Sequence, residues 1–147
     1  MKKLLGLGCC LYASITFAVM KSQCLNLVTT IHNYTSSACE LLQKNIYNAR
    51  MLSEDDYTII LPKESKTIKL QEFESIFKAY SELSLSYACG SGQVTMTMRK
   101  EPCIKGGAIT ADTVAISNME ASATTSIGSA WHNRPGTVTW TLSENFR

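Results

Sequence analysis

Motifs for the common catalytic and nucleotide-binding sites are missing from this 147-residue chain. It has no G-x-S-x-G nucleophile elbow, P-loop, dinucleotide fingerprint, H-E-x-x-H pair or EF-hand loop. Its six cysteines include no C-x-x-C pair, and neither histidine has a partner at metal-ligand spacing. We therefore expect no metal site and no cofactor, and no reaction is identified by sequence.

Net charge is also small. The chain has 14 basic and 12 acidic residues, and loss of Lys2 and Lys3 with a signal peptide would leave 14 − 2 = 12 of each. A domain with no net charge lacks the basic surface that binds nucleic acid, so no nucleic-acid partner is expected.

The first residues are typical of a secretory signal. Lys2 and Lys3 precede an apolar run over residues 4–20. Thr16-Phe-Ala18 supplies small residues before a signal-peptide cleavage site after Ala18. This predicts a signal peptide over residues 1–18 and one secreted or periplasmic domain over 19–147, without a transmembrane helix in the mature chain.

Two alternatives remain open for this segment. The first is a transmembrane helix that stays in the mature protein, although the apolar run is slightly shorter than the ~20 residues that span a bilayer. Gly8-Cys9-Cys10 could also mark lipid attachment at Cys9 or Cys10, although the apolar stretch before it is short for a lipoprotein signal.

Cleavage after Ala18 leaves an even number of cysteines. In a short exported chain this favours two disulfides, with three connectivities that the sequence does not rank. The four cysteines are Cys24, Cys39, Cys89 and Cys103.

Alternation of apolar and polar residues predicts a mainly β fold. Residues 83–89 and 93–98 alternate on either side of Gly90-Ser-Gly92, which is typical of a β-hairpin, and its outer face is formed by serines and threonines. Residues 137–142 follow Pro135-Gly136 and predict a closing strand with Val138, Trp140 and Leu142 facing inward. Weaker strands are expected within residues 25–32, 57–61, 67–70 and 108–117.

Two segments favour short helices instead. Ser37 and Glu40 fit a capping box, followed by apolar residues at helical spacing up to Ala49. Phe73, Phe77 and Tyr80 are also spaced as on one helix face. The expected fold is an antiparallel β-sandwich with one or two short helices, stapled by disulfides.

The most distinctive loop begins at Trp131. An indole and a guanidinium separated by an imidazole and an amide can stack on a sugar or hold a lipid headgroup, so the predicted ligand-binding residues are Trp131, His132, Asn133 and Arg134. Alternatively, Trp131 covers the end of the sandwich, Asn133 shapes the turn and Arg134 is solvated.

The order of motifs along the chain also resembles that of a known family. The order of Asn33-Tyr-Thr35, Pro62, Cys89-Gly-Ser-Gly92 and Pro135-Gly-Thr-Val-Thr-Trp140 resembles small secreted β-sandwiches of the aegerolysin and actinoporin-like kind. The resemblance spans residues 25–142 and implies membrane-lipid binding. The chain differs from these families in its four mature cysteines and in lacking a dense aromatic cluster.

The sequence thus predicts an exported, non-enzymatic recognition domain for a glycan, a membrane lipid or a host protein. One alternative is a small hydrolase that uses His132 with Glu54, Asp55 or Asp56. Another is a structural or inhibitory protein that docks to one protein partner. Asn33-Tyr-Thr35 also matches the N-glycosylation pattern, which alone decides nothing.

Overall fold

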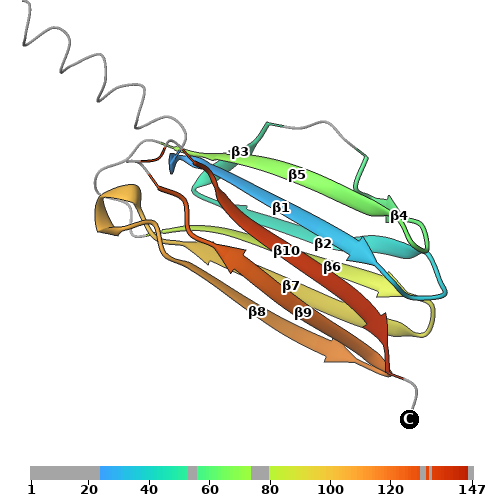
Figure 1. Ribbon diagram of the computed structural model, residues 1–147. Coiled ribbons are helices and arrows are strands. Elements are labelled where there is room, and N and C mark those ends of the chain that lie inside the picture. The colour runs from blue at the N-terminus through green and yellow to red at the C-terminus, as the bar shows by residue number, and fades with distance from the viewer. Residues whose placement is uncertain (1–23, 53–55, 74–79, 130–131, 133, 146–147) are drawn as a thin grey trace, which may run out of the picture.

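The computed structural model describes residues 24–52, 56–73, 80–129, 132 and 134–145. They form a two-layer β-sandwich of two five-stranded sheets (Figure 1). The elements are β1 (Asn26–Asn33), β2 (Cys39–Tyr47), β3 (Ala49–Met51), β4 (Ile59–Ile60), β5 (Ser65–Glu72), β6 (Ser81–Cys89), β7 (Gly92–Lys100), the 3-10 turn η1 (Cys103–Lys105), β8 (Ile109–Ile116), β9 (Met119–Ser126) and β10 (Gly136–Glu144).

The first sheet has the order β3-β5-β1-β10-β9 and the second β4-β2-β6-β7-β8. Among the described strands, all pairs are antiparallel except β1 and β10, which run parallel along the middle of the first sheet. The β8–β9 turn, where Ser117 and Asn118 both adopt positive φ, joins an edge of one sheet to an edge of the other. The predicted mainly β sandwich is confirmed.

The core follows from the period of two in the strands. In β6, β7 and β10 alternate residues are buried, including Val138, Trp140 and Leu142 as predicted from the sequence. On the outer face of the predicted hairpin, Ser84 bonds Thr97 at 3.0 Å and Ser86 bonds Thr95 at 2.8 Å. These hydroxyl pairs stabilise the β6–β7 ladder from its solvent side.

The helix predicted from Ser37 to Ala49 is wrong, because this segment forms β2 and begins β3. A β-bulge between Leu41 and Gln43 shifts the register. Leu42 falls in this bulge and is 56% exposed, whereas Ile46 lies opposite Leu83 and packs against the core. The apolar residues at helical spacing therefore do not form one buried face. The helix predicted around Phe73 to Tyr80 falls mostly on residues 74–79, outside the described residues.

Two disulfides join the four predicted cysteines. Cys39 and Cys89 connect neighbouring strands β2 and β6, and Cys24 before β1 is joined to Cys103 in η1, which ties the first sheet to the second. Disulfides of this kind indicate an oxidising, extracytoplasmic environment. In the part of the chain that the structure describes, no helix is long and apolar enough to cross a bilayer.

The two ends of the sandwich differ. We call the end where β1 and β10 finish the Asn33 end, and the end where they begin the Cys24 end (Figure 1). The Asn33 end includes the turns after β1, β4, β6 and β8, and the Cys24 end includes η1 and the connection into β10.

Candidate functional site

The loop predicted as a binding site lies at the Cys24 end, before β10. Ser129 and Arg134 form an isolated antiparallel bridge, with both backbone hydrogen bonds at 3.0–3.1 Å. His132 is exposed, and both its Nδ1 and its backbone N–H contact Ser129 Oγ, at 3.0 and 3.2 Å. Trp131 and Asn133 lie outside the described residues. The structure thus brings His132 and Arg134 into one tight loop, and their role in ligand binding stays a prediction.

The carboxylates considered for a hydrolase do not contact His132 among the described residues. Glu54 and Asp55 lie outside that part of the chain, and Asp56 is exposed. The Asp56 carboxylate accepts hydrogen bonds from the hydroxyl and the backbone N–H of Thr58, which hold its pKa below the usual range. This is the geometry of a turn cap before β4, not of a general base. Within the described part, no three His, Cys, Asp or Glu side chains are grouped to hold a metal ion.

The side chain of Asn33 holds the loops at this end of the sandwich, the Asn33 end, by hydrogen bonds. Its side chain is fully buried, and Nδ2 donates to Ser37 O at 2.9 Å and Ile60 O at 2.8 Å. Its Oδ1 accepts from the backbone and the hydroxyl of Thr35, at 2.9 and 2.7 Å. Three of these hydrogen bonds shape the loop after β1, and the fourth ties that loop to the end of β4.

The backbone of Asn33 continues this connection. Its N–H donates to Glu64 O at 3.0 Å, and its C=O accepts from Lys63 N at 2.7 Å. Lys63 has φ 65°, a positive value that is uncommon for a residue with a side chain. The turn is thus held in a defined conformation against the end of β1.

These two loops present an apolar and cationic surface. Tyr34 is 64% exposed and Leu61 is 55% exposed, and Pro62 and Lys63 beside them are also exposed. We call these four residues the tip. Single exposed apolar residues are common in soluble proteins, so the informative feature is that one buried asparagine fixes the loops that present all four.

Charges around the tip are unevenly compensated. Glu64 pairs with Lys66 at 2.8 Å and accepts from Leu61 N at 2.9 Å, and both contacts, Lys66 first, lower the pKa of its carboxyl. Lys63 forms no ion pair with any residue in the described part of the chain. The tip therefore combines an aromatic ring and an aliphatic side chain with an ammonium that forms no ion pair among the described residues.

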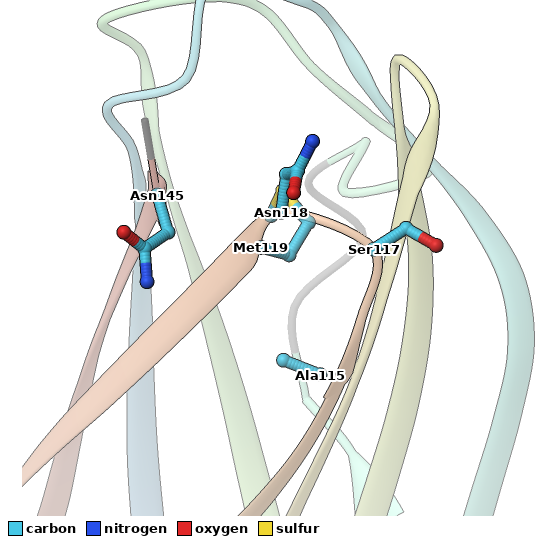
Figure 2. Close-up of a pocket in the computed structure, with 5 residues that line it drawn as sticks. All are labelled: Ala115, Ser117, Asn118, Met119 and Asn145. Carbon is cyan, nitrogen blue, oxygen red and sulfur yellow. The ribbon is translucent and has the colours of Figure 1, made fainter. Parts of the chain in front are cut away.

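A shallow depression lies nearby, at the β8–β9 turn (Figure 2). It has a volume of about 250 Å³ and is lined by Ala115, Ser117, Asn118, Met119 and Asn145. Asn145 N donates to Asn118 O at 2.7 Å, which fixes the turn against the end of β10. No titratable side chain is among the residues that line the depression.

Sequence reasoning did not identify the tip. Tyr34 was part of a glycosylation pattern, and Pro62 was only one element of the family resemblance. One signal could have found it. Tyr34 closely follows one predicted strand, and Pro62 and Lys63 directly follow another. Loops that leave the same end of a sandwich lie close together, so these residues could be expected to share a surface.

Two solved structures share this architecture. The lipid-binding protein Nakanori aligns with a TM-score of 0.66 and 8% identity over 90% of this chain and 79% of its own. IP-1A from Alcaligenes faecalis aligns with a TM-score of 0.61 and 14% identity over 86% of this chain and 96% of its own. No protein-family model matches the sequence and no curated protein matches it. The predicted resemblance to aegerolysin-like β-sandwiches is confirmed at the level of the fold.

Proposed function

We propose that this protein is an exported, non-enzymatic domain that binds the surface of lipid membranes through the tip. The observation that carries the proposal is the grouping of Tyr34, Leu61 and Lys63 on two loops fixed by Asn33. The shared fold with a lipid-binding protein supports the same class of ligand.

Three of the four tip residues have distinct roles at a membrane. Leu61 enters the outer acyl region, where burial of one leucine side chain contributes about 2 kcal/mol. Tyr34 lies at the headgroup level, which suits a ring with an apolar body and a polar hydroxyl. Lys63 contacts lipid phosphates and adds about 1 kcal/mol when the surface is anionic. Because the loops are already ordered, binding requires little further loss of conformational entropy.

Vesicle co-sedimentation tests this assignment. Leu61→Asp and Tyr34→Asp should each weaken binding to phosphatidylcholine vesicles by about tenfold or more, since each loses an inserted group and adds a charge. Lys63→Gln should reduce the gain in binding when phosphatidylserine is added.

The matched control is Ile127→Asp, which alters an equally exposed apolar residue next to the predicted Trp131 to Arg134 loop at the Cys24 end. If Ile127→Asp abolishes vesicle binding and Leu61→Asp does not, the membrane-facing end is the opposite one. Binding to neither phospholipid by the folded wild-type protein would refute the proposal.

A further inference from the structure

A second cluster of exposed side chains lies on the outer face of the second sheet, near the Cys24 end. Tyr47, Glu82 and Arg99 occupy directly opposed positions on β2, β6 and β7, so they form one row across three strands. Tyr80, immediately before β6, completes the cluster. Its ring centroid lies 5.4 Å from that of Tyr47, with the planes tilted by 42°.

The cluster is held in place before any ligand arrives. The Arg99 guanidinium lies 4.0 Å above the centre of the Tyr80 ring, and its Nε and Nη2 both donate to Glu82 Oε2, at 3.3 and 3.0 Å. Asn48 Nδ2 donates to Tyr80 O at 3.1 Å and so fixes the backbone that carries the second ring. Even so, Tyr47 remains 55% exposed and the Arg99 side chain 48% exposed.

We infer that this row is a binding site for a neutral saccharide. A pyranose ring stacks its C–H face on the exposed Tyr47 ring, because an aromatic face is a large, rigid and partly polar platform. Adjacent sugar hydroxyls donate to Glu82 Oε1, the carboxylate oxygen that Arg99 does not use, and accept from Arg99 Nη1, the guanidinium nitrogen that does not donate to Glu82.

Charge selects this ligand class over others. Arg99 and Glu82 compensate each other, so an anionic phosphate or sulfate would have to displace Glu82 from Arg99. A quaternary ammonium would need an open pair of aromatic faces, and Arg99 already covers Tyr80. A neutral polyhydroxyl ligand is the class that uses the cluster as it stands.

The site is separate from the tip. Strand β6 runs between the two ends of the sandwich, and its nine residues span about 30 Å. Saccharide binding and membrane binding therefore use different residues, and one can fail in an experiment without the other.

The test is a glycan array carrying neutral, sialylated and sulfated oligosaccharides, followed by calorimetric titration of the best neutral glycan as a soluble oligosaccharide. We expect retention of neutral glycans and a loss of about tenfold or more in affinity for Tyr47→Ala, with Tyr47→Phe close to wild type because the ring is kept. Glu82→Gln should weaken binding, and Val114→Ala, on β8 of the same face, should not. Thermal unfolding identifies variants that fail to fold.

Competition by soluble glycan against vesicles bearing the same glycan as a glycolipid distinguishes the two sources of the saccharide. If soluble glycan inhibits binding to these vesicles, the glycan itself is recognised. If the protein binds the glycolipid vesicles and soluble glycan does not inhibit that binding, the inference is overturned. It is equally overturned if no neutral glycan is retained above the Tyr47→Ala level, or if acidic glycans or phosphocholine are preferred.

Discussion

Lys100 Nζ lies 2.9 Å from Glu72 Oε2, and the two side chains are 0% and 7% exposed. The pair joins β7 of one sheet to β5 of the other beside the Cys24–Cys103 disulfide. Ser81 Oγ donates to the second oxygen of Glu72, and Lys100 also reaches Glu101 O at 3.4 Å. Both charges are therefore removed from water with partners for each.

Breaking this pair should be costly. Lys100→Met or Glu72→Gln leaves one group buried without its partner, and each should lower the free energy of unfolding by about 3–5 kcal/mol. The double variant should lose clearly less unfolding free energy than the sum of the losses in the two single variants. Urea unfolding in a double-mutant cycle measures this difference. Lys66→Met, which breaks the more exposed pair with Glu64, should cost less than about 1 kcal/mol. Strictly additive losses would show that the buried pair is not coupled.

Asn33 should carry no glycan in the folded protein. Its Nδ2, the atom a glycan would occupy, is buried and donates two hydrogen bonds. After expression through a eukaryotic secretory pathway, the intact mass of the folded protein should be unchanged by peptide N-glycosidase. A mass decrease on treatment would contradict this.

Replacement of the same residue tests its structural role. Asn33→Ala removes all four hydrogen bonds of this side chain and takes the acceptor away from the buried backbone N–H of Thr35, so we expect a loss of about 3 kcal/mol in unfolding free energy. Asn45→Ala, at an exposed position of β2, should change it by less than about 0.5 kcal/mol.

Tyr87 should make stability fall at high pH. Burial raises the pKa of this phenol, which donates to Tyr57 O at 2.8 Å. Below the unfolded-state pKa of about 10, both states keep the proton and the contribution to stability is complete. Above it only the unfolded state ionises, so wild type should lose about 1 kcal/mol more than Tyr87→Phe between pH 10 and 11.

Urea unfolding at several pH values measures this difference. Tyr34→Phe, which removes the hydroxyl of an exposed tyrosine, is the matched control. An unchanged pH dependence in Tyr87→Phe would assign the effect to another group.

The disulfides should pair Cys24 with Cys103 and Cys39 with Cys89. Peptide mapping without reduction should recover these two linked pairs, and alkylation should label all four cysteines only after reduction. Cys39→Ala with Cys89→Ala should lower unfolding free energy by about 2–4 kcal/mol, since the bridge constrains a 50-residue separation in the unfolded chain. Recovery of a Cys24–Cys39 peptide from native protein would contradict the pairing.

Residues that alternate and face a core were predictable from sequence. The β6–β7 hairpin and β10 followed from large apolar residues at every second position. The same rule missed β9, whose core-side positions include Ala121, Ala123 and Thr125, because this edge strand is largely exposed and needs no large side chains.

The candidate sites depend on tertiary pairing, which local pattern does not encode. Tyr47 and Arg99 are 52 positions apart in the sequence, and only strand register places them in one row with Glu82. Likewise, Tyr34 and Leu61 belong to one surface because a buried asparagine connects their loops. Loop residues such as His132 and Arg134 were distinctive by composition alone, without information on their neighbours.

The parallel pairing of β1 with β10 also fixes an order of events in time. Because β10 lies between β1 and β9, the first sheet cannot close until β10 has been synthesised. The second sheet has all its strands by Ile116 and can assemble earlier. The first sheet thus stays incomplete until β10 is available, and slow closure of these non-local strands completes the domain.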